Sequence, residues 1–185
     1  MRIPTFILPL IAVFFMQCAK EKDPFLITKN QIGNLHSDIM IQQIDSVLAQ
    51  DSIVYFTPET SFMAQSEQVE VYEKGGKLLM TLSPSRQGDP NSKISHIQIF
   101  DDRYKTDKGL SKNSVFKEVK DNYTISSIQN TFSNIVVSLK DSDVYITLDK
   151  KELPEALRYD SSLKIESSQI PDNAKFKYFM IGWNE

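Results

Sequence analysis

Apolar and polar side chains alternate along three segments of the chain, at residues 93–100, 134–139 and 143–148. Successive side chains of a β-strand point to opposite faces of its sheet, so a period of two is typical of a strand with one buried face. Sheets with one covered face and one solvated face are commonly antiparallel. The alternation therefore predicts an antiparallel sheet, and we expect its inward side chains to include Ile97, Ile99, Ile135, Val137, Leu139, Val144, Ile146 and Leu148.

A pair of glycines predicts a β-hairpin in the first half of the chain. Gly75 and Gly76 separate the segments 69–73 and 78–82, and glycine supplies the positive φ that a tight turn needs. A last strand at 175–183 is apolar on both faces, which predicts a strand that is central or well covered. Further strands are expected at 52–56 and 124–129.

Two segments have the apolar spacing of amphipathic helices. The first helix is expected over 38–49, with Ser37 or Asp38 as its N-cap and an apolar face made of Ile41, Ile44, Val47 and Leu48. The second is expected to be capped by Asn113 or Ser114, and its apolar face is Val115, Phe116, Val119 and Tyr123. Together with the strands, these helices predict an α+β fold in which two helices pack on an antiparallel sheet.

The order of the expected elements suggests an internal repeat of turn, helix and strands. Gly33 aligns with Gly109 at an offset of 109 − 33 = 76, and residues 90–94 align with 172–176 at an offset of 82. We therefore divide the chain into two α+β halves, 25–104 and 105–185. A glycine turn followed by a helix is a common unit, so two unrelated segments with similar turns remain the alternative.

The N-terminal segment has the composition of a secretory signal. One cation, Arg2, precedes the uncharged residues 4–16, a segment shorter than the roughly 20 apolar residues of a membrane-spanning helix. Cys18, the only cysteine of the chain, follows after Gln17. The pattern resembles a bacterial lipoprotein signal, which implies a signal peptide at 1–17, lipid on Cys18 and a flexible stalk at 18–24. The protein is then expected in the cell envelope, anchored by its N-terminal lipid, and Ala19 favours the outer membrane.

Charge and motifs narrow the classes of function. The formal net charge is −3 and no basic patch is present, so nucleic acid is not expected as a partner. His36 and His96 have no second histidine or cysteine at metal-ligand spacing, which predicts no metal site. No glycine-flanked nucleophilic serine and no phosphate-binding loop occurs, so we expect neither a cofactor nor a named catalytic residue.

A few residues remain as candidate sites. Asp101 and Asp102 follow an expected strand and could act as acid or base, although a solvated turn with a local Asp–Arg pair is the simpler interpretation. Ser52 lies in an Asp-Ser-aliphatic triplet that resembles a bacterial O-glycosylation acceptor. If each half covers one sheet face with its own helix, the two free faces join into a concave binding surface. We expect that surface to carry His96, Gln98, Tyr145 and Thr147.

The second half also resembles a known family. Residues 97–106, Gly109-Leu110, Leu153-Pro154 and 178–183 look like the C-terminal half of uncharacterised envelope lipoproteins, often described as sigma-E-regulated. The chain lacks the cysteine pair that many of those relatives carry near the second hairpin. More loosely, the doubled plan is similar to the β-lactamase inhibitor protein and to BamE-like outer-membrane-assembly lipoproteins. This resemblance implies a protein-binding module without catalysis.

The expected function is therefore a lipid-anchored, non-catalytic envelope module that binds another protein or the cell wall. Two alternatives stay open. One is an enzyme that acts on envelope polymers through strand-end carboxylates such as Asp101 or Asp102. The other is a carrier that holds a small apolar ligand between sheet and helices.

Overall fold

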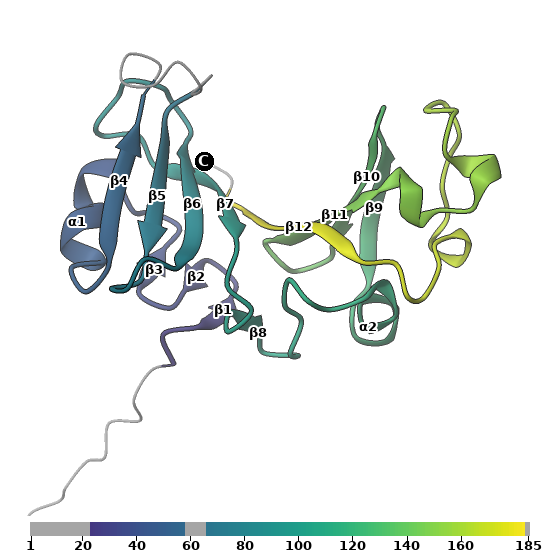
Figure 1. Ribbon diagram of the computed structural model, residues 1–185, viewed down its shortest axis with the longest axis horizontal. Coiled ribbons are helices and arrows are strands. Elements are labelled where there is room, and N and C mark those ends of the chain that lie inside the picture. Colours follow the sequence, from purple (N-terminus) through teal and green to yellow (C-terminus); the bar gives the residue numbers. More distant parts are fainter. Residues whose placement is uncertain (1–22, 58–65, 184–185) are drawn as a thin grey trace, which may run out of the picture.

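The computed structural model describes residues 23–57 and 66–183, and these form one large antiparallel sheet with two short α-helices (Figure 1). The large sheet has eight strands in the spatial order β4-β5-β6-β7-β12-β11-β10-β9. Its strands are β4 (Ser52–Phe56), β5 (Gln68–Tyr72), β6 (Leu78–Pro84), β7 (Ile94–Ile99), β9 (Ile125–Asn130), β10 (Asn134–Leu139), β11 (Val144–Asp149) and β12 (Phe176–Gly182). The fold is thus α+β, as the periodicity predicts.

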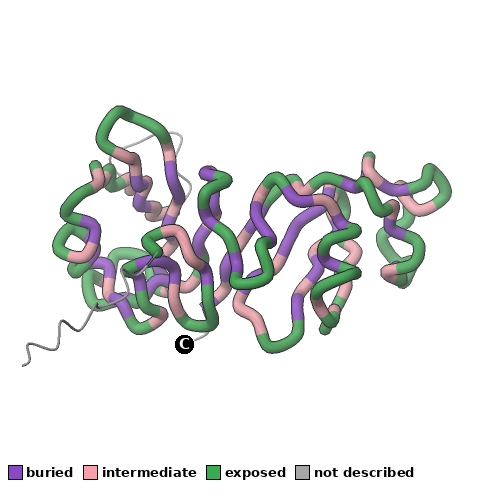
Figure 2. Tube along the Cα trace, turned by 90° about the horizontal axis from the view of Figure 1, so that it is seen from below, coloured by how far each residue is buried: buried purple, intermediate pink, exposed green. Residues whose placement is uncertain are grey.

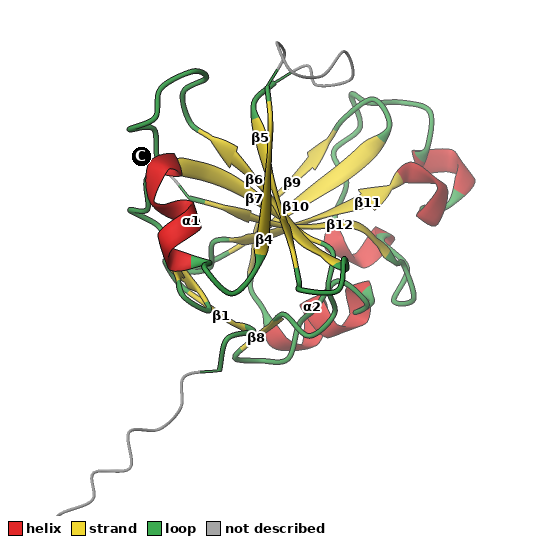
Figure 3. Ribbon diagram, turned by 60° about the vertical axis from the view of Figure 1, so that its left-hand side comes forward, coloured by secondary structure: helices red, strands yellow, loops and turns green. Residues whose placement is uncertain are grey.

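The remaining elements are short. A small sheet has the order β3-β2-β1-β8, with β1 (Leu26–Thr28), β2 (Gln31–Ile32), β3 (Leu35–His36) and β8 (Lys105–Thr106). The helices are α1 (Ile44–Val47) and α2 (Phe116–Asn122), with 3-10 turns η1 (Ile41–Gln43), η2 (Lys150–Glu152), η3 (Glu155–Leu157) and η4 (Ser167–Gln169). Seen in Figure 3, the strands fan out around the centre of the sheet, because its strong twist accumulates from strand to strand.

One face of the large sheet is apolar from edge to edge. A row of eight laterally paired side chains crosses all eight strands: Ile53, Val71, Met80, Ile99, Phe179, Ile146, Val137 and Ile128. The six central members are buried, and they share one core cluster with Ile44 of α1 and with Phe116 of α2. Figure 2 shows buried segments running through the centre of the molecule. Burial of this face against both helices is the main source of stability.

The same order of elements occurs twice, as the expected repeat requires. α1 precedes β4 to β7, and α2 precedes β9 to β12. In each half, the residue before the helical segment forms a bridge with the start of the last strand: Met40 with Lys93, and Val115 with Lys175. The offsets, 115 − 40 = 75 and 175 − 93 = 82, are close to those found in the sequence.

A local two-fold axis relates the two halves where β7 meets β12. Ile97 pairs with Ile181, and Ile99 pairs with Phe179. At the offset of 82, Ile97 corresponds to Phe179 and Ile99 corresponds to Ile181, so the offset exchanges the two pairs. Gln98 pairs with Met180, and Met180 is also the residue that corresponds to Gln98 at the offset of 82. The axis therefore passes through the Gln98–Met180 pair, and the two four-stranded halves form one sheet through the last strand of each.

The helix starts differ from the expectation. The first helix begins as a 3-10 turn after Met40, and neither Ser37 nor Asp38 caps it. Gln43 Oε1 instead accepts a hydrogen bond from the Met40 backbone N–H at 2.9 Å. In α2 the N-cap position is Val115, whose N–H donates to Glu118 Oε1 at 3.3 Å. In both halves, a long polar side chain three residues after the N-cap thus accepts a hydrogen bond from the backbone N–H of the N-cap residue.

Candidate functional site: the outer face of the sheet

The face of the large sheet opposite the helices, here called the outer face, is defined by a second row of paired residues. The row crosses all eight strands as Val54, Glu70, Thr81, Gln98, Met180, Tyr145, Ser138 and Ser127. No member of this row is buried. Along each strand, residues of this row alternate with residues of the apolar row. The strand register therefore places the apolar row on the helix-covered face and, apart from Val54 and Met180, side chains that can form hydrogen bonds on the outer face.

A glycine makes room for an aromatic side chain on the outer face. A Cβ atom on Gly182 would lie 3.2 Å from Tyr145 Cε1, so the absence of a side chain leaves room for the tyrosine ring on β12. The ring lies edge-to-face with His96 of β7, with 6.3 Å between the ring centroids. His96 Nδ1 in turn lies 3.0 Å from Ser95 Oγ. Tyr145 therefore bridges the junction between the halves.

Three of the four residues expected on the binding face gather at this junction. Gln98 and His96 come from β7, and Tyr145 reaches them from β11 across β12. Thr147 lies on the same face but is only 7 % exposed, so it contributes less surface than expected. Burial raises the pKa of Tyr145 above its ordinary value, and its hydroxyl stays protonated at neutral pH.

The structure adds residues that the sequence pattern missed. The last strand is central, as predicted, and its outer face is partly open, because Tyr178 of β12 is 40 % exposed and Met180 is partly exposed. Lys177 Nζ lies 5.5 Å from the centre of the Tyr178 ring. The signal that could have identified this surface is Gly182, since glycine inside a strand marks a close approach.

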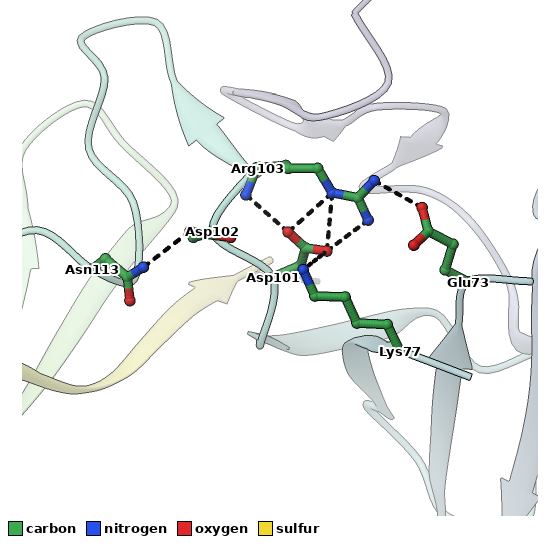
Figure 4. A network of polar contacts seen from close by, with 6 residues as sticks. All are labelled: Glu73, Lys77, Asp101, Asp102, Arg103 and Asn113. Carbon is green, nitrogen blue, oxygen red and sulfur yellow. Dashed lines mark hydrogen bonds and ion pairs between the residues drawn. The ribbon is translucent and has the colours of Figure 1, made fainter. Parts of the chain in front are cut away.

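The strand-end carboxylates belong to a separate polar network (Figure 4). Asp101 has no exposed surface, and its carboxylate accepts hydrogen bonds from Arg103 N at 2.9 Å and from Arg103 Nη2 at 2.6 Å. Lys77 Nζ lies 3.0 Å from the same carboxylate, and Arg103 Nη1 donates to Glu73 at 2.7 Å. The expected Asp–Arg pair is present, but Asp101 is buried and not solvated.

The network decides what Asp101 can do chemically. Burial by itself raises its pKa, but hydrogen bonds from Arg103 and Lys77 outweigh burial and hold the pKa of Asp101 well below its ordinary value. A carboxylate that stays ionised and has its oxygens occupied is poorly suited to proton transfer at neutral pH. Asp102 is exposed and accepts a hydrogen bond from Asn113 Nδ2 at 3.1 Å. The two side chains thus lie in different environments.

The two modification sites remain predictions. Ser52 is exposed at the start of the edge strand β4, where its hydroxyl is accessible. Cys18 lies outside the described residues.

Within residues 23–57 and 66–183, no helix has the length and apolar character needed to span a membrane.

Comparison with known proteins supports the fold and little beyond it. No protein-family model matches the chain, and no curated protein matches its sequence. Among solved structures, the crystal structure of the uncharacterized protein YfeY from Escherichia coli matches with a TM-score of 0.52 and 16 % identity. The match covers 84 % of this chain and 98 % of that chain. This chain therefore has a fold similar to that of YfeY.

Proposed function

We propose that this chain is a non-catalytic module of the cell envelope, anchored by lipid on Cys18, that binds another protein through the outer face of its sheet. The anchor rests on the N-terminal sequence, in which the single cysteine follows a short apolar segment. Several acyl chains hold a protein on a membrane stably, whereas one chain binds only marginally. The module thereby stays close to other envelope proteins.

The outer face around the Gln98–Met180 pair is the observation that carries the proposal. Its side chains stand on central strands that are paired on both sides, so the backbone that presents them is rigid. The face combines Tyr145, Tyr178 and Met180 with hydrogen-bonding groups such as His96. Tyrosine and methionine are enriched at protein interfaces, where one surface must exclude water and still pair polar groups. This composition favours a protein partner over cell-wall polymer.

The two alternatives have less support from the geometry. An enzyme that uses Asp101 needs a carboxylate free to exchange protons, and this one is held by Arg103 and Lys77. A carrier of an apolar ligand needs space between sheet and helices. Ile44 and Phe116 are instead fully buried in the core there.

The test compares two double variants of the full-length lipoprotein in native membranes. His96→Ala/Tyr178→Ala changes two positions of the outer face that the local two-fold axis relates. Lys117→Ala/Asp121→Ala removes an exposed ion pair on α2 and serves as the matched control. After crosslinking and purification, we expect the first variant to lose a protein that both the wild type and the control retain. Thermal unfolding must show that both variants remain folded.

Equal recovery of that protein with all three forms would overturn the proposal. Retention of every form on purified cell wall, with no protein recovered, would instead favour the cell-wall alternative. Replacement of Cys18 by alanine tests the anchor separately: membrane retention of a cleaved, unlipidated product would contradict it.

A further inference from the structure

A cavity of about 300 Å³ is lined mainly by the second half, and the end of β1 in the first half contributes as well. Four separate parts of the chain line it: the end of β1, residues 106–108 at and after the end of β8, residues 123–124 directly after α2, and residues 140–144 between β10 and β11. Its charged lining residues are Lys29, Asp107, Lys108, Lys140 and Asp141, and its hydroxyl groups come from Thr28, Thr106, Tyr123, Thr124 and Ser142. Three lysines against two aspartates leave one excess positive charge.

One of the three lysines is held in place. Lys108 Nζ donates a hydrogen bond to the Asn122 carbonyl at 2.8 Å and lies 4.7 Å from the centre of the Tyr123 ring. Lys29 and Lys140 form no ion pair with any residue of the described segments. Lys29 and Lys140 therefore line the cavity without a carboxylate bound to them, and Asp107 and Asp141 line it as well.

Two contacts fix the wall, one between the halves and one within the second half. The Asn30 backbone N–H, at a residue with φ of 61°, donates to Asp143 Oδ2 at 2.6 Å, which joins the first hairpin to the β10–β11 turn. Thr106 Oγ1 and Tyr123 OH lie 2.5 Å apart. A cavity formed by rigid partners presents its groups to a ligand with little ordering cost.

The equivalent position in the first half has a different lining. A cavity of about 220 Å³ there is bordered by Leu48, Glu73 and Met80, which correspond to Tyr123, Asp141 and Val144 of the second half. Its lining includes no lysine, and its two acidic residues are Asp51 and Glu73. The positive lining is thus absent from the equivalent cavity and is not part of the repeated plan.

We propose that the second-half cavity, here called the lysine cavity, binds a phosphate-bearing anion. Lysine binds phosphate as a compact point charge, and neighbouring hydroxyl groups can donate to the remaining oxygens. The phosphate belongs either to a soluble small molecule or to a lipid headgroup. Under the proposed anchor, only five positions separate Cys18 from Asp23, the first described residue, and the cavity-lining Ile27 follows shortly. A headgroup is therefore within reach of the site.

The test measures amide hydrogen exchange of the full chain around residues 28–29, 107–108 and 140–142. The chain is compared in detergent, in detergent with inorganic phosphate, and in vesicles with equal parts of phosphatidylglycerol and phosphatidylcholine. Slower exchange with inorganic phosphate supports a soluble ligand, and slower exchange in the anionic vesicles alone supports a lipid headgroup. Unchanged exchange in both overturns the proposal.

Charge variants provide the second readout. Lys29→Ala/Lys140→Ala should weaken binding of the protecting ligand by about tenfold or more, because both lysines that are free of ion pairs are removed from the cavity. Lys93→Ala/Lys151→Ala removes the same charge from exposed positions outside the lysine cavity and should leave binding unchanged. Equal weakening by both variants would show a general charge effect and contradict the assigned site. These variants leave the outer-face residues unchanged, so failure of this experiment would not count against the proposed protein binding.

Discussion

Replacement of Asp101 by asparagine tests the buried polar network most sharply. Asparagine keeps the shape of the side chain but removes the charge that Arg103 and Lys77 approach. Loss of one partner from a buried ion pair typically costs about 3–5 kcal/mol. The Arg103 and Lys77 side chains are 38 % and 53 % exposed, so water partly compensates them and the lower end, about 3 kcal/mol at pH 7, is expected.

The loss should depend on pH in one direction. The pKa of Asp101 is lower in the folded chain than its ordinary value of 3.8, so the ionised carboxylate stabilises the fold. That contribution is fully present above the unfolded value and is lost as pH falls through the folded one. The stability difference between wild type and Asp101→Asn should therefore be constant at neutral pH and narrow below about pH 4.

Urea unfolding at several pH values measures both effects. Asp102→Asn is the matched control, because this neighbouring carboxylate is exposed, and its loss should change stability by about 0.5 kcal/mol or less. A loss below about 1 kcal/mol for Asp101→Asn, or a loss equal to that of the control, would refute the described network.

Three further predictions concern the core, a turn and the anchor. Ile44→Ala and Phe116→Ala should each lower the free energy of unfolding by about 2–5 kcal/mol in urea titrations, because both side chains are fully buried. Gly33→Ala should lower the melting temperature more than Gly88→Ala; both residues have positive φ, but a Cβ on Gly33 would lie 2.2 Å from a backbone oxygen and one on Gly88 meets open space. Cys18→Ala should move the protein from the membrane fraction to a soluble or unprocessed form on fractionation.

Much of the sheet was predictable because its residues obey a local rule. The alternation at 134–139 and 143–148, and the glycine turn between β5 and β6, gave strand ends within two residues of the structure. Each pattern records burial on one face, which depends on the strand itself. The helix starts were less predictable, because Gln43 and Glu118 satisfy the free N–H groups from inside the helix.

Features that depend on contacts between residues far apart in the sequence could not be derived from the sequence pattern. Nothing local in the sequence shows that Lys77 and Glu73 meet Arg103 beside Asp101, since the β5–β6 turn must first fold against the end of β7. Likewise, β12 has apolar or aromatic side chains on both faces, and only its pairing with β7 and β11 shows that Tyr178 lies on an uncovered face. Tertiary contacts, which a period of two does not encode, decide these cases.

The central claim is that the outer face at the junction of the halves binds a protein. The most direct measurement places a photo-crosslinking amino acid at Gln98 of the full-length lipoprotein and, as a control, at the exposed Lys117 of α2. Irradiation in membranes should give a discrete protein adduct from position 98 and none from position 117. The same adducts from both positions, or no protein adduct from position 98, would contradict the account.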